Sequence, residues 1–124
     1  MNKHVVIFSS LLLLFLSSCG LFEGPRTCTL ELVMVTVEVT GDSLDQTYTI
    51  WSGTQDTVER STAPINENAY LVLDDRYQPS LQNEVREFRF IGLKGGSILV
   101  DELFTIEADE CHISKVSGVD QVAL

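Results

Sequence analysis

Apolar and polar residues alternate along most of the chain after residue 27, which is the pattern of β-strands that bury one face. β-Branched and aromatic residues are frequent in the alternating segments, as is typical of strands. These segments are 27–40, 47–52, 58–61, 69–75, 84–93, 97–107, 111–116 and 121–124. Turn-forming stretches such as GDSLDQ (41–46) and KGGS (94–97) separate them. Only SLQNEVREF (80–88) has a weak helical pattern.

The first strand changes its apolar face partway along. Leu30, Leu32 and Met34 share one face, whereas valines from 33 to 39 occupy the other. Such a change indicates a β-bulge or a strand that passes between two sheets. Together with the short, regularly spaced strands, it predicts an all-β fold. We expect a single antiparallel β-sandwich of about seven strands over residues 28–124, with a small β-barrel as the alternative.

The first 18 residues have the composition of a cleaved secretory signal peptide. Lys3 precedes the apolar run from Val5 to Leu16, and Ser17 and Ser18 follow it. The run is shorter than the ~20 residues that a membrane-spanning helix needs.

The sequence Leu16-Ser17-Ser18-Cys19 resembles the lipobox of bacterial lipoproteins. The resemblance implies cleavage before Cys19, acylation of its thiol, and anchoring on a membrane. Residue 20 is Gly rather than the Asp that often signals inner-membrane retention in that family, so the outer membrane is expected. Residues 19–27 then form the lipidated cysteine and a short tether.

The mature chain is strongly acidic. The full chain has a net charge of −10, and loss of Lys3 with the leader lowers it to −11. Such a surface repels nucleic acid and anionic headgroups, so we exclude nucleic-acid binding. Calcium or a basic partner is compatible with this charge.

Cys28 and Cys111 are the two cysteines that remain after Cys19. An even pair in an exported chain indicates a disulfide. Zinc binding and Cys-His catalysis are alternatives for the stretch ADECHISKVSG (108–118), but neighbouring side chains of an extended segment point in opposite directions. His112 is therefore expected to be a surface side chain. Only a pocket that placed a carboxylate and a hydroxyl beside His112 would favour a hydrolase.

Acidic pairs and one aromatic residue are the remaining candidates for ligand binding. Asp74, Asp75, Asp109 and Glu110 lie near predicted strand ends, although no known calcium-loop motif contains them. Trp51 is a candidate for stacking on a carbohydrate or contacting a partner. The glycines at 92, 95 and 96 lack the Lys-Ser/Thr ending of a phosphate loop, so no cofactor is expected.

Two wider resemblances concern the fold and the class of protein. The stretch VTVEVTGDSLDQTYTIWSG (35–53) is similar to the first hairpin of transthyretin-like, carboxypeptidase-regulatory-like domains. The chain as a whole resembles small, mostly uncharacterised bacterial surface lipoproteins. We therefore expect a non-enzymatic binding or structural module near the outer membrane with a membrane-proximal protein partner. A carbohydrate- or calcium-binding module is the alternative.

Overall fold

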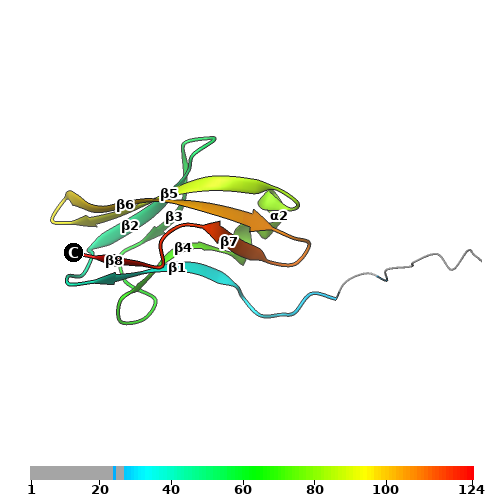
Figure 1. Ribbon diagram of the computed structural model, residues 1–124, viewed down its shortest axis with the longest axis horizontal. Helices are drawn as coiled ribbons and strands as arrows, with labels where there is room; N and C mark the ends of the chain where they lie inside the picture. The colour runs from blue at the N-terminus through cyan, green and yellow to red at the C-terminus, as the bar shows by residue number, and fades with distance from the viewer. Residues whose placement is uncertain (1–23, 25–26) are drawn as a thin grey trace, which may run out of the picture.

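The computed structural model describes residue 24 and residues 27–124, in which eight strands form two sheets (Figure 1). The strands are β1 (Met34–Thr40), β2 (Gln46–Trp51), β3 (Asp56–Ser61), β4 (Ala69–Asp74), β5 (Val85–Lys94), β6 (Ser97–Ala108), β7 (Ile113–Ser117) and β8 (Gln121–Ala123). Between β4 and β5 lie a 3-10 turn, η2 (Asp75–Tyr77), and one helical turn, α2 (Gln78–Leu81). The weak helical pattern at 80–88 thus corresponds only to α2, and β5 takes most of that segment.

The two sheets are open and pack face to face. One has the strand order β4-β1-β8 and the other the order β3-β2-β5-β6-β7. Every pairing is antiparallel except that of β1 with β8. The expected all-β sandwich is confirmed, and the alternative of a small barrel is wrong because neither sheet closes on itself in the described part of the chain.

The core fills the space between the sheets with side chains from the inner faces of both. Val37 and Val72 of the three-stranded sheet meet Phe88, Phe90 and Phe104 of the five-stranded sheet, and all five are fully buried. The rings of Phe90 and Phe104 pack edge to face, with centroids 6.4 Å apart. Burial of these apolar side chains supplies the main driving force for folding.

The pairing of β1 with β4 shifts its register once, and the extra residue is Val72 of β4 and not a residue of the first strand. Val35 pairs with Leu73, but the next residue, Thr36, pairs with Leu71. The regular strand begins only at Met34, so residues 27–33 of the predicted first strand are an extended lead-in. The alternation along β1 is therefore simple, with valines inward and Met34 outward.

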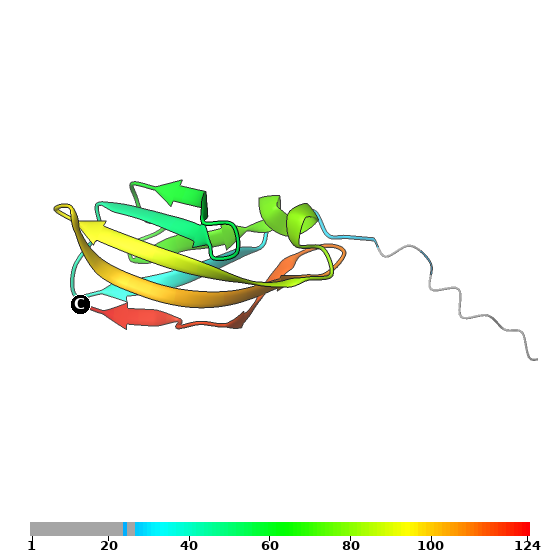
Figure 2. The same ribbon diagram turned by 90° about the horizontal axis from the view of Figure 1, so that it is seen from above.

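The sandwich has two distinct ends, and residues 27–33 enter the domain at one of them. Residues 27–33 enter at the end where α2 and the β6–β7 connection lie, and we call this the tether end (Figures 1 and 2). The β5–β6 turn and the C-terminus lie at the opposite end, the far end (Figure 1).

Candidate functional site

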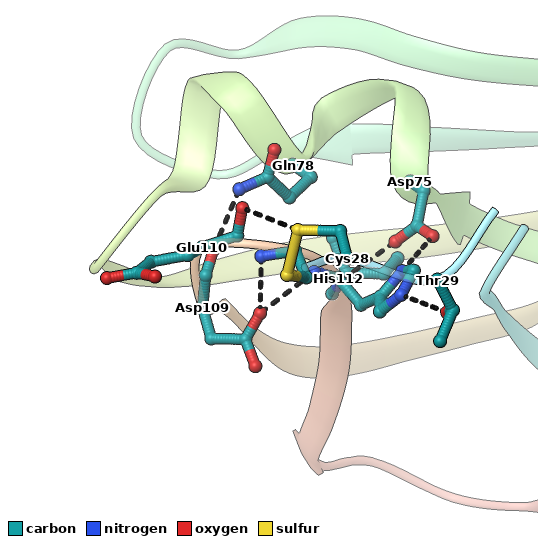
Figure 3. The surroundings of a disulfide bond; sticks show 9 residues. Cys28, Thr29, Asp75, Gln78, Asp109, Glu110 and His112 are labelled. Atoms are coloured by element: carbon teal, nitrogen blue, oxygen red, sulfur yellow. Dashed lines mark hydrogen bonds and ion pairs between the residues drawn. A yellow bond between two sulfur atoms is a disulfide. The ribbon is translucent and has the colours of Figure 1, made fainter. Parts of the chain in front are cut away.

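A disulfide joins Cys28 to Cys111 at the tether end (Figure 3). The two Cα atoms lie 5.2 Å apart and the residues are separated by 83 positions. The disulfide expected from the cysteine count is thus present. It holds the lead-in to β1 against the connection between β6 and β7.

His112 connects two segments beside the disulfide instead of standing free at the surface. Its Nδ1 lies 2.7 Å from Oδ2 of Asp75, and its Nε2 lies 2.8 Å from Oγ1 of Thr29 (Figure 3). Because an ionised carboxylate only accepts hydrogen bonds, Nδ1 carries the proton in this arrangement. In the neutral ring Nε2 then accepts from the Thr29 hydroxyl. Neither of these partners of His112 was predicted from the sequence.

Asp75 is the centre of this network. Its carboxylate also accepts hydrogen bonds from the backbone N–H groups of Val33 and Ile113, at 2.8 and 2.9 Å. Burial by itself would raise the pKa of Asp75, but the bonds from Ile113, Val33 and His112 outweigh it and hold the pKa below its ordinary value. One side chain thereby joins the lead-in to β1, the start of β7 and the turn after β4.

Asp109 organises the corner before β7. Its Oδ1 accepts from the backbone N–H groups of Cys111 and His112, and its carbonyl accepts from Nε2 of Gln78 in α2 (Figure 3). These bonds fix the turn that carries the disulfide and the histidine. Glu110, beside it, is exposed.

Asp74 lies in a separate, partly buried ion-pair network. The Asp74 side chain is buried, and its Oδ1 accepts from the backbone N–H and the Nε–H of Arg76, each at 2.9 Å. Arg76 also pairs with Glu59 at 2.6 Å. The structure therefore does not gather Asp74, Asp75, Asp109 and Glu110 into one convergent oxygen site. In the described residues no group of three or more His, Cys, Asp or Glu side chains is placed to hold a metal ion.

Trp51 lies half-buried at the end of β2, and its ring packs on Phe88 with centroids 5.6 Å apart. The tryptophan is therefore partly built into the core. This leaves less of its face for stacking on a sugar.

A shallow hollow of about 420 Å³ lies on the outer face of the five-stranded sheet. Its lining residues come from β2, β5, β6 and the β2–β3 turn: Ile50, Ser52, Gln55, Glu87, Arg89, Asp101 and Leu103. Arg89 Nε donates to Asp101 Oδ1 at 2.7 Å, and this bond lowers the pKa of Asp101. Leu103 is 53% exposed. The hollow thus combines apolar side chains with a fixed cation–carboxylate pair.

The parts that Thr29 and Gln78 play in this site, and the hollow, were not predicted from the sequence. A signal for Thr29 existed: a Cys28–Cys111 bond brings the following residues, Thr29 and His112, close together. Nothing local marked Asp75 as the partner of His112, because the two are 37 positions apart.

Several features expected from the sequence fall on residues outside those that the structure describes. Cys19, the leader 1–18 and most of the tether 19–27 belong to this group. Within the described part, no helix has the length and apolar character to span a membrane. No protein-family model, curated protein or solved structure matches the chain.

Proposed function

We propose that the protein is an outer-membrane lipoprotein, anchored through acylated Cys19, whose β-sandwich is a non-enzymatic module that binds a membrane-proximal protein. The lipobox-like LSSC at 16–19 supports the anchor. Two or three acyl chains on one cysteine give stable attachment, whereas a single chain gives marginal binding.

The observation that carries the binding role is the hollow beside Leu103. The hollow joins the apolar side chains of Ile50 and Leu103 to the guanidinium of Arg89, and arginine is enriched at protein interfaces. Most of the lining residues lie on regular strands, so the surface is preformed and requires little ordering on binding. The acidic mature chain would favour a partner with a basic surface.

Photo-crosslinking in the native membrane tests this proposal. A photoreactive phenylalanine analogue replaces Leu103 in one variant and Val116 of β7 in a matched control, since these side chains are 53% and 54% exposed. We expect a discrete protein adduct from position 103 that is weak or absent from position 116. The adduct should also be lost when Arg89→Glu is added. Equal adducts from both positions, or none from either, would contradict the binding role.

The anchor has its own test. Metabolic labelling with a radiolabelled fatty acid should label the wild-type chain and leave Cys19→Ala unlabelled. Cys28→Ser keeps Cys19 and should retain the label. Label on Cys19→Ala would exclude this lipidation site.

One observation favours a second function, acyl transfer. Asp75, the His112 ring and the Thr29 hydroxyl follow one another in the order of a carboxylate–histidine–hydroxyl triad, at 2.7 and 2.8 Å. In such a reaction Thr29 Oγ1 attacks an ester carbonyl while His112 Nε2 takes the proton of the Thr29 hydroxyl. The histidine then gives this proton to the leaving alcohol. Water finally hydrolyses the acyl-threonine. The hollow beside Leu103 lies elsewhere on the surface. p-Nitrophenyl acetate hydrolysis should be equal in the wild type and Thr29→Ala if the network is only structural, and a loss of turnover in Thr29→Ala would favour the enzyme.

A further inference from the structure

We infer that Leu30, Leu32 and Met34 form a membrane-docking surface that lays the tether end of the domain against the bilayer. We call these three side chains the apolar row. The inference rests on the proposed anchor at Cys19 and adds which part of the domain faces the lipid.

The two leucines of the apolar row are the most exposed large hydrophobic side chains in the described part of the chain. Leu30 is fully exposed at 105% of its reference area, and Leu32 and Met34 are 57% and 44% exposed. Val33 and Val35, which alternate with Leu32 and Met34, pack toward the core instead. Leu71, paired with Thr36 across the bulge, extends the apolar character onto β4. Leu30, Leu32 and Met34 recur at every second position, and exposed apolar side chains that gather in this way mark a surface that contacts a partner or a membrane.

The apolar row is held to the domain on both sides. The disulfide of Cys28 fixes the chain two residues before Leu30. Val33 makes two hydrogen bonds with Asp75. The Val33 N–H donates to the Asp75 carboxylate, and the Val33 carbonyl accepts from the Asp75 N–H. A docking surface fixed in this way orients the whole sandwich rather than a loose arm.

The position of the anchor selects the lipid bilayer as the occupant. Eight residues lie between Cys19 and Cys28, and an extended chain spans at most ~3.3–3.6 Å per residue, so the tether end stays within ~30 Å of the acylated cysteine. β6 alone is 12 residues long, about 40 Å, and its start near Ile98 lies at the far end. The apolar row is thus the exposed apolar group nearest the tether.

The chemistry of the row also fits lipid. Its three side chains are uncharged and aliphatic, like those that enter the boundary between headgroups and acyl chains. Because the acidic domain repels anionic headgroups, docking would depend on apolar burial and not on charge. A zwitterionic bilayer is therefore the appropriate probe.

Fluorescence quenching by lipid tests the inference in the acylated, full-length protein. Leu30→Trp and Ile98→Trp each introduce a second tryptophan beside the native Trp51. The two positions are exposed and lie at opposite ends of the sandwich. The proteins are reconstituted in phosphatidylcholine vesicles with or without bromine on the acyl chains. We expect the added emission of Leu30→Trp to shift to shorter wavelength and to be lost in brominated vesicles. The added emission of Ile98→Trp should be unchanged, as should the wild-type signal from Trp51.

Three outcomes distinguish docking from anchoring. If the protein floats with the vesicles but Leu30→Trp is not quenched, the anchor stands and docking is refuted. Equal quenching at positions 30 and 98 would also refute docking, because the domain would then have no preferred orientation. If the protein fails to float with the vesicles, the anchor itself fails and the inference falls with it. Adding Leu32→Asp to Leu30→Trp should reduce the quenching while the protein still floats.

Discussion

The imidazole of His112 and the carboxylate of Asp75, which are 37 positions apart in the chain, lie 2.7 Å from each other at the tether end of the sandwich. The same carboxylate accepts backbone hydrogen bonds from Val33 and Ile113. Three segments therefore depend on one side chain, which is only 12% exposed. Removal of an acceptor leaves buried donors unsatisfied, which costs more than the net gain from forming each bond.

We predict that Asp75→Asn lowers the free energy of unfolding by about 1–3 kcal/mol at neutral pH, as expected when charged hydrogen bonds at a buried site are lost. The pKa of Asp75 is lowered in the folded protein, so its contribution is fully present above the unfolded value of about 3.9 and is lost as the pH falls through the lower folded value. The variant should therefore lose less stability than the wild type on acidification below about pH 4. Urea titrations across this range measure the difference.

Glu67→Gln is the control for that experiment, because Glu67 is exposed in the loop before β4. It removes one carboxylate without touching the network. A Glu67→Gln profile that differs from the wild type as much as the Asp75→Asn profile does would show that overall charge, and not the Asp75 site, sets the acid response.

The disulfide should contribute strongly to stability because it closes a long loop. We expect the Cys28→Ser/Cys111→Ser double variant to lose about 2–5 kcal/mol of unfolding free energy. The Val33 amide should also exchange faster with deuterium, since the lead-in loses its covalent attachment. Mass spectrometry of unreduced peptides should find Cys28 linked to Cys111 in the wild type, and two free thiols there would contradict the structure.

Gly118 allows the chain to pass from β7 to β8, and hence from one sheet to the other. Its φ of 128° is rarely adopted by other residues, and a Cβ would overlap the ring of buried Phe104. We expect Gly118→Ala to lower the melting temperature, at a cost of about 1–3 kcal/mol from overpacking alone. Gly95→Ala, also at positive φ but in open space, should cost less. Equal losses would assign the effect to backbone strain and not to the overlap.

Thr49 has a fully buried hydroxyl without a hydrogen-bond partner among the described residues. Thr49→Val replaces this hydroxyl with a methyl group of similar size, so we expect stability to rise by about 1 kcal/mol. Thr49→Ser keeps the hydroxyl and loses a methyl group, and should be destabilised by about the same amount. Thermal unfolding of the two variants and the wild type measures these changes in stability. A Thr49→Val variant less stable than the wild type would contradict the prediction.

The class of fold and the disulfide could both be predicted from the sequence. Alternation with a period of two follows from strand geometry, so the strand positions could be predicted without knowing which strands pair. The Cys28–Cys111 bond followed from a count, since no other cysteine remains after Cys19. These features depend on local geometry or on elimination, and both are visible along the chain.

The strand order, the parallel pairing of β1 with β8 and the partners of the polar side chains could not be predicted, because they depend on how the chain folds in space. Which carboxylate reaches His112 depends on how the turn after β4 meets the corner before β7, and that relationship is set by the packing of two sheets. The same packing partly buries Val33 and leaves Leu30 and Leu32 exposed, although all three are apolar and lie within four positions of one another. The chain alone shows that a residue is apolar or charged, whereas its neighbours in space depend on long-range pairing and burial.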